Sequence, residues 1–151
     1  MAPSRSDLDR DVRLHLYGEF VASGRPPTAA ETASALGRTE EKIEDAYRRL
    51  EQAHVIVLAP GTLNVWMANP LSAVPTPFRV ETARGSFWGN CVWDALGVVG
   101  MLGREGRVST SCPDCGEAMT FAVENGELRT SDGVAHFAVP AARWWENIGF
   151  T

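Results

Sequence analysis

The spacing of apolar residues near the N-terminus restricts the fold of this chain more than any other feature. An apolar residue recurs there every four positions, at Leu8, Val12, Leu16 and Phe20. This period predicts one buried stripe of an amphipathic helix, which the Pro26-Pro27 pair should end. Thr28 and Glu31 have the spacing of a capping box and predict the start of a short second helix.

A third helix and a hairpin should follow. Thr39 is a candidate N-cap, and the apolar face of the helix after it carries Ile43, Ala46, Tyr47 and Leu50. The apolar runs at 55–58 and 63–67 flank a Pro60-Gly61 turn and predict two short strands. Three helices followed by a hairpin is the order of a winged helix-turn-helix, which we assign to residues 1–70.

The charge pattern argues against nucleic-acid binding by this N-terminal part. The formal net charge of the chain is −5, whereas non-specific affinity for nucleic acid depends on clustered Lys and Arg. The third predicted helix has the position of a recognition helix, yet it begins with Glu40 and Glu41, which would repel phosphates. We therefore expect a winged helix that packs within the protein and has no nucleic-acid partner.

Residues 71–151 are expected to form a second, mixed α/β domain, which makes the fold class α+β. Prolines within residues 69–77 mark the connector, and Asn125-Gly126 is the strongest hairpin signal. Trp144-Trp145 is expected in the core, at a rim, or as a lid over an apolar ligand pocket. The expected elements are a strand at 78–82, a helix at 90–102, strands at 108–111, 119–124, 127–130 and 135–139, and a helical turn at 141–147.

Composition limits the compartment and the partners. The chain is 44% hydrophobic over 151 residues, as in ordinary globular proteins, and no apolar run is long enough to span a membrane. Its polar start shows no secretory signal, so we expect a cytoplasmic protein. The odd count of three cysteines argues against a secreted disulfide framework. Reactivity, metal binding or burial therefore remain to explain the free thiols.

Cys91 and Asp94 are the strongest candidates for chemistry. Asn90 is expected to cap a helix, which puts Cys91 in the first turn, where free N–H groups and the helix dipole favour a thiolate. Asp94 follows on the same face. An ionised Asp94 would oppose the thiolate, whereas a carboxyl group kept protonated by burial would act as a general acid. Gly89 should leave room for a ligand. The alternative for Cys91 is a buried structural cysteine.

Cys112 and Cys115 form a Cys-x-x-Cys dithiol. Soft thiolates bind soft metals, and zinc or copper are candidates. Structural zinc requires four ligands, so a closed zinc site would need distant partners such as Cys91 and His136. The alternative is a turn that carries two reduced thiols.

Taken together, these residues resemble the alkylmercury lyases. The likeness spans most of the chain, because a winged-helix-like part precedes a mixed α/β part. The stretch Cys91-x-x-Asp94-x-Leu96, in an apolar helix that ends at Leu102-Gly103, is similar to the catalytic helix of that family. Cys112 is similar to an additional, structural cysteine of the family.

The resemblance implies that Cys91 binds the mercury of an organomercurial and that Asp94 delivers the proton that releases the hydrocarbon. Hg(II) then stays on protein thiols as the bound product until small thiols remove it, and no organic cofactor is required. The family has a second catalytic cysteine near the C-terminus, whereas this chain has none after Cys115. Three explanations stay open: a sequence that stops before that cysteine, its replacement by Cys115, or a homologue that binds metal without lyase activity.

Overall fold

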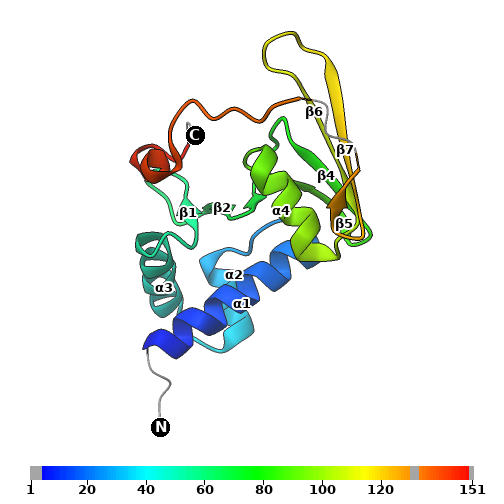
Figure 1. Ribbon diagram of the computed structural model, residues 1–151. Coiled ribbons are helices and arrows are strands. Elements are labelled where there is room, and N and C mark those ends of the chain that lie inside the picture. Colours follow the sequence, from blue (N-terminus) through cyan, green and yellow to red (C-terminus); the bar gives the residue numbers. More distant parts are fainter. Residues whose placement is uncertain (1–4, 130–132, 150–151) are drawn as a thin grey trace.

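Three helices begin the chain. The computed structural model describes residues 5–129 and 133–149. The helices are α1 (Arg5–Ser23), α2 (Ala29–Leu36) and α3 (Glu40–Gln52). They lie together at one end of the molecule (Figure 1). The predicted stripe of α1 is confirmed, because Val12, Leu16 and Phe20 are buried.

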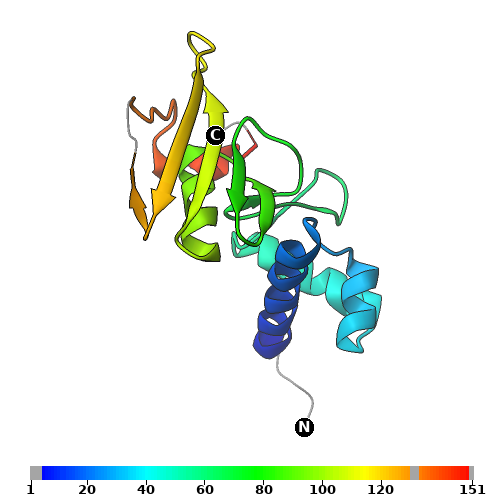
Figure 2. The same cartoon turned by 90° about the vertical axis from the view of Figure 1, so that its right-hand side faces the viewer.

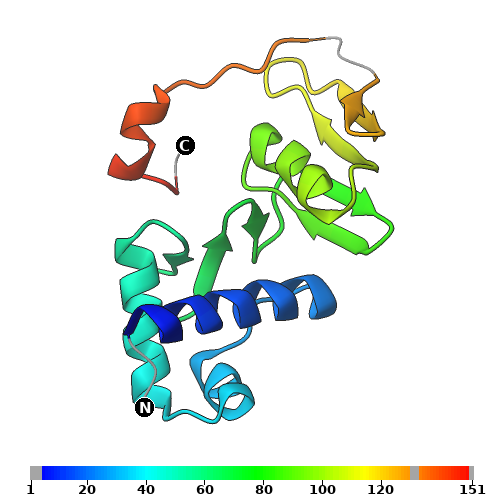
Figure 3. The same cartoon turned by 60° about the horizontal axis from the view of Figure 1, so that its bottom comes forward.

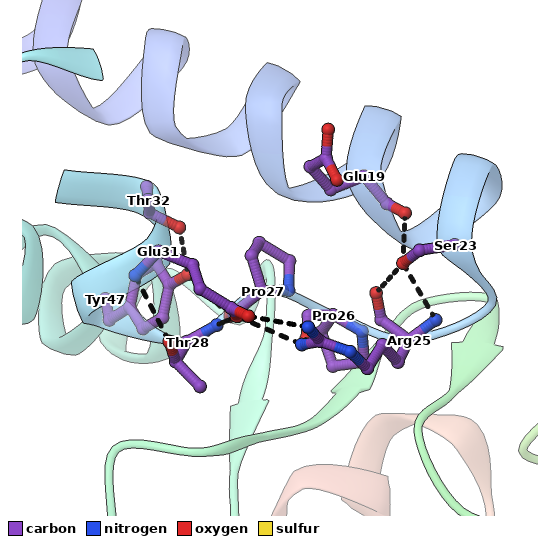
Figure 4. A network of polar contacts seen from close by, with 9 residues as sticks. All are labelled: Glu19, Ser23, Arg25, Pro26, Pro27, Thr28, Glu31, Thr32 and Tyr47. Atoms are coloured by element: carbon purple, nitrogen blue, oxygen red, sulfur yellow. Dashed lines mark hydrogen bonds and ion pairs between the residues drawn. The ribbon is translucent and has the colours of Figure 1, made fainter. Parts of the chain in front are cut away.

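The predicted capping box at the start of α2 is present (Figure 4). Thr28 Oγ1 accepts a hydrogen bond from the Glu31 N–H at 3.2 Å, and the Glu31 carboxylate accepts one from the Thr28 N–H at 2.7 Å. Arg25 adds a two-pronged ion pair to Glu31, with N···O distances of 2.6 and 3.0 Å. These contacts fix the connection between α1 and α2. Thr39 is the N-cap residue of α3, but its side chain makes no capping hydrogen bond.

Tyr47 joins α3 to α2. Its side chain is fully buried, and its hydroxyl donates to the Pro27 carbonyl at 3.0 Å and lies 2.9 Å from Thr32 Oγ1 (Figure 4). A buried hydroxyl group requires such partners. The predicted core face of α3 is confirmed, since its buried residues are Ile43, Ala46, Tyr47 and Leu50.

A small antiparallel sheet follows α3. Its strands are β1 (Val57–Leu58), β2 (Val65–Ala68) and β3 (Leu71–Ser72), in the order β1-β2-β3. The predicted hairpin is confirmed, although its strands are shorter than expected. β3 lies inside the predicted connector and pairs with β2, and a bridge joins Leu71 to Gly89. One hydrophobic core includes both Ile56 and Val98, so packing continues across residue 70. The division into two domains stays a prediction.

A larger antiparallel sheet packs against the next helix, α4 (Val92–Leu102). The strands of this sheet are β4 (Arg79–Thr82), β5 (Gly85–Trp88), β6 (Gly106–Ser111), β7 (Ala118–Glu124) and β8 (Glu127–Leu128), in the order β5-β4-β6-β7-β8. α4 packs on one face of this sheet and contacts β4 and β6 (Figure 2). Helices and antiparallel sheets together confirm the predicted α+β class. No described helix is long and apolar enough to cross a membrane.

The start of α4 differs from the prediction in three respects. α4 begins at Val92, so Cys91 rather than Asn90 is the N-cap residue. Residues 85–88, where no strand is predicted, form a strand that pairs with β4. A Cβ atom at Gly89 would lie 2.6 Å from the Ala95 backbone. Glycine at this position therefore allows α4 to pack closely, and the space is not available to a ligand.

The C-terminal part confirms one prediction and corrects another. Asn125 and Gly126 have φ angles of 56° and 81°, as a tight hairpin turn between β7 and β8 requires. The predicted strand at 135–139 is wrong, since the described residues 133–140 contain no strand. No strand of the described residues pairs with this segment, which leads to a 3-10 helix, η1 (Ala141–Glu146), near α3 and β1 (Figure 3). Residue 130, the end of the strand predicted at 127–130, lies outside the described residues.

Candidate functional site

A cavity of about 490 Å³ lies where four parts of the chain meet. These are the end of β2 with the β2–β3 connection, Phe78 just before β4, the start of α4, and residues 136–149. Cys91 and Asp94 both line the cavity, so the fold brings the predicted pair to one space. The remaining lining residues are apolar side chains, two asparagines, a histidine and a glycine: Met67, Asn69, Phe78, Asn90, Val92, His136, Phe137, Ala138, Val139, Trp144, Trp145, Ile148 and Gly149.

Cys91 is held by the start of α4. As the N-cap residue it has an extended backbone, with φ −145° and ψ −177°, and its Sγ accepts a hydrogen bond from the Asp94 N–H at 3.5 Å. Burial raises the pKa of the Cys91 thiol, and the Asp94 carboxyl group adds to that rise. The N–H groups of Trp93 and Asp94 oppose it. Burial outweighs them, so the expected stabilisation of a thiolate by the helix start is present but does not dominate.

Asp94 lies in an environment that favours its neutral form. Burial raises the pKa of this carboxyl group, and a hydrogen bond from the Asn90 side chain opposes the rise. No Lys or Arg is among the described residues that line the cavity, so no cation there favours the ionised form. This is the condition under which the sequence predicts a proton donor.

Asn90 and Asn69 support Asp94, and the sequence did not indicate this role. Asn90 Nδ2 donates to Asp94 Oδ2 and to Asn69 Oδ1, both at 3.1 Å. The backbone carbonyl of Asn69 accepts a hydrogen bond from the Tyr17 hydroxyl at 2.8 Å. Tyr17 belongs to α1, so this chain of contacts connects the N-terminal helices to the cavity.

The C-terminal segment forms the opposite wall. Trp144 Nε1 donates to the Val139 carbonyl at 2.8 Å, and its ring lies 5.2 Å from that of Phe137. Trp145 is 39% exposed and stacks on His54, which follows α3. The two tryptophans therefore lie at the rim of an apolar pocket, one of the positions expected from the sequence.

Cys112 and Cys115 lie away from this cavity. They occupy the tip of the β6–β7 hairpin, which extends beyond the rest of the sheet (Figure 1). Neither cysteine is among the described residues that line the cavity. The N–H groups of Cys115 and Asp114 and the Cys115 thiol lower the pKa of Cys112. No group of three or more His, Cys, Asp or Glu in the described ranges is arranged to hold a metal ion. The fold therefore does not join Cys91 and His136 to this dithiol as a closed zinc site would require.

The chain is similar to known proteins in sequence and in fold. The sequence profile of the family described as alkylmercury lyase (MerB) matches residues 71–151. The crystal structure of the mercury-bound form of MerB2 is similar in fold, with a TM-score of 0.63 and 19% sequence identity. The likeness covers 80% of this chain and 59% of that one, so this chain spans less than two thirds of its length. No curated protein matches the sequence.

Proposed function

The chain belongs to the alkylmercury lyase family, and on that premise we propose that it cleaves the carbon–mercury bond of organomercurials. The observation that carries this proposal is the cavity shared by Cys91 and Asp94. It offers a thiol for mercury and a carboxyl group with a raised pKa as the acid. The apolar side chains of Phe78, Trp144 and Ile148 provide a surface for the hydrocarbon.

Mercury binding is the first step. The organomercurial arrives as a complex with a small thiol, and Cys91 displaces that thiol from mercury. Thiolates are the metal ligands, so the Cys91 proton has to leave, and the displaced small thiolate takes it. Cys91 therefore does not need to be ionised beforehand, in agreement with its raised pKa. The exchange leaves the oxidation state of mercury unchanged.

Protonolysis is the second step. The carboxyl proton of Asp94 moves to the carbon atom, the carbon–mercury bond breaks, and the hydrocarbon leaves. A general acid must hold its proton at the working pH, and burial of Asp94 favours that state. A small thiol then binds mercury as its thiolate and returns a proton to Asp94. Another small thiol displaces Cys91, and Hg(II) departs as the dithiolate.

We assign the second sulfur to a small thiol because of the cysteine positions. Cys91 is the one cysteine of the described residues that lines the cavity, and Cys115 is exposed at the hairpin tip. This route needs no organic cofactor. Small thiols are abundant in a reducing cytoplasm, which we propose as the location.

We further propose that residues 1–70 are a winged-helix module that packs within the protein and does not bind nucleic acid. Arg48 of α3 is paired with Glu44 and Asp45 at 3.3 and 3.0 Å. Arg49 is paired with Asp9 at 2.6 Å. These cations are already neutralised, which disfavours binding to phosphates.

A second candidate is a homologue that binds a soft metal ion such as Hg(II), copper or zinc through its thiols without cleaving carbon–mercury bonds. Cys91 is the one cysteine that lines the cavity among the described residues, and this favours the second candidate, because mercury there would be held by one sulfur atom of the protein. The two candidates differ in one product, the hydrocarbon.

Benzene release from phenylmercury in excess glutathione tests the proposal. We expect release by the unmodified chain, none with Cys91→Ser, and a rate lower by about 10²–10⁴-fold with Asp94→Asn, the usual contribution of a general acid. Cys115→Ser should leave the rate unchanged. If the unmodified chain binds mercury but releases no more benzene than Cys91→Ser does, the second candidate is established instead.

A further inference from the structure

The Cys112–Cys115 dithiol has no role in the reaction proposed for the cavity, and its position makes it a candidate for a separate one. It occupies the turn between Ser111, the last residue of β6, and Ala118, the first of β7. Cys115 is exposed and Cys112 is half-buried. Both thiols are therefore accessible to a ligand that approaches from solvent, without passage through the cavity.

The turn holds its two thiols together. The Cys112 N–H donates to the Glu117 carbonyl at 2.8 Å, and the Gly116 N–H donates to the Cys112 carbonyl at 2.9 Å. Gly116 has a φ of 74°, a conformation that favours glycine. Within this closed turn the N–H groups of Cys115 and Asp114, and the Cys115 thiol, lie close enough to Cys112 to lower the pKa of its thiol. The dithiol is thus preorganised, which reduces the entropy that a chelated ion would cost.

The number of donors decides which ion fits. The described residues contain no third His, Cys, Asp or Glu that completes a metal group with these thiols. Zinc in structural sites takes four ligands, so two thiols on one turn do not satisfy it. Soft ions select thiolates, and Hg(II) is satisfied by two of them. Residues 112–118 also include Asp114 and Glu117 and no Lys or Arg, so the local charge favours a cation.

We propose that Cys112 and Cys115 form a two-thiolate site for Hg(II) that is separate from the Cys91 cavity and takes the ion from its complexes with small thiols. In the exchange, two mercury–sulfur bonds to the protein form and two bonds to the small thiols break. The two protons of the cysteine thiols pass to the released thiolates, and no group is oxidised or reduced. The site does not depend on the lyase reaction.

Mercury retention by cysteine variants of the full chain tests the site. Cys91→Ser keeps only the dithiol, and Cys91→Ser/Cys115→Ser is the matched control with one thiol in the same turn. Each is incubated with the Hg(II) complex of glutathione in excess glutathione, desalted, and analysed for bound mercury by native mass spectrometry. X-ray absorption then counts the sulfur atoms around mercury. Circular dichroism checks that both variants are folded.

We expect Cys91→Ser to retain one Hg(II) per chain with two sulfur ligands. The control should bind it about 10²–10⁴-fold more weakly, because the second thiol of a chelate acts at a high effective concentration. Equal retention by the two variants would overturn the proposal. So would a mercury ion with four sulfur ligands from two chains, or equally strong retention of Zn(II) in the same competition.

Discussion

His54 and Trp145 stack face to face, with ring centroids 3.9 Å apart and planes inclined by 5°. His54 lies just after α3, and Trp145 belongs to η1, so the stack ties the C-terminal segment to the N-terminal helices. A second contact lies nearby, because a Cβ atom at Gly149 would be 2.7 Å from the ring of Trp66 in β2. These two contacts hold the wall that carries Trp144 over the cavity.

Removal of the stack should loosen this wall. We expect His54→Ala to increase amide hydrogen exchange in residues 141–147 by about 2- to 12-fold, since an aromatic pair contributes about 0.5–1.5 kcal/mol. His54 does not line the cavity, so the substitution leaves the walls chemically intact. His15→Ala in α1 is the control and should leave exchange in this segment unchanged. Equal exchange in both variants would mean that the stack does not hold the segment.

Asn90 should control the ionisation of Asp94. Its Nδ2 donates to Asp94 Oδ2 at 3.1 Å, and this bond opposes the rise in the carboxyl pKa that burial causes. Asn90→Leu keeps the volume but removes the donor to the ionised form. We therefore expect the pKa of Asp94 to rise further, measured by carboxyl NMR titration of the metal-free chain. Asn64→Leu, in the loop before β2, is the control and should not change it; an unchanged or lower pKa in Asn90→Leu would contradict the assignment.

Gly89 and Gly100 should respond in opposite directions to the same substitution. Gly89→Ala forces a Cβ atom against the Ala95 backbone at 2.6 Å, and overpacking of this kind costs about 1–3 kcal/mol. Gly100 lies within α4 with no atom near its Cβ position, so Gly100→Ala should stabilise the protein by about 0.5–1 kcal/mol. Urea unfolding of both variants measures the difference. A neutral Gly89→Ala would show that α4 can move away from this residue.

Local patterns predicted the parts of the fold that local physics determines. The four-residue period from Val12 to Phe20 and the Asn125-Gly126 turn are both confirmed, because a buried helix face and a tight hairpin leave a direct mark on the sequence. β3 and β5 were missed since they are short and carry no clear alternation. The strand expected at 135–139 had such a pattern, but no strand in the described part of the chain pairs with it, and strands depend on pairing.

The candidate site divides in the same way. Cys91 and Asp94 are three residues apart, so both were expected at the start of one helix. This spacing can be seen in the sequence alone. Asn90 was expected to be a cap, whereas it contacts Asp94 and, 21 residues away, Asn69. Such contacts between distant residues leave no periodic signal. The same holds for the wall from His136 to Gly149, whose position over the cavity depends on tertiary packing.

The Arg25–Glu31 pair should make stability depend on acid pH. The hydrogen-bonded Arg25 side chain, followed by the Thr28 N–H, lowers the pKa of Glu31 from 4.5 to about 2. A lowered carboxyl pKa means that the ionised form stabilises the fold at pH above 4.5, and that this contribution is lost as the pH falls through about 2. Glu31→Gln removes this contribution. In urea unfolding we therefore expect the variant to be less stable than the unmodified chain at pH 6, and to lose less stability between pH 4.5 and about 2.

Added salt should reduce the difference in stability between the two proteins, because both side chains of the pair are exposed. Glu105→Gln removes a charge from the loop after α4 and is the control; a slope equal to that of Glu31→Gln would mean that general charge, and not the capping pair, sets the acid sensitivity.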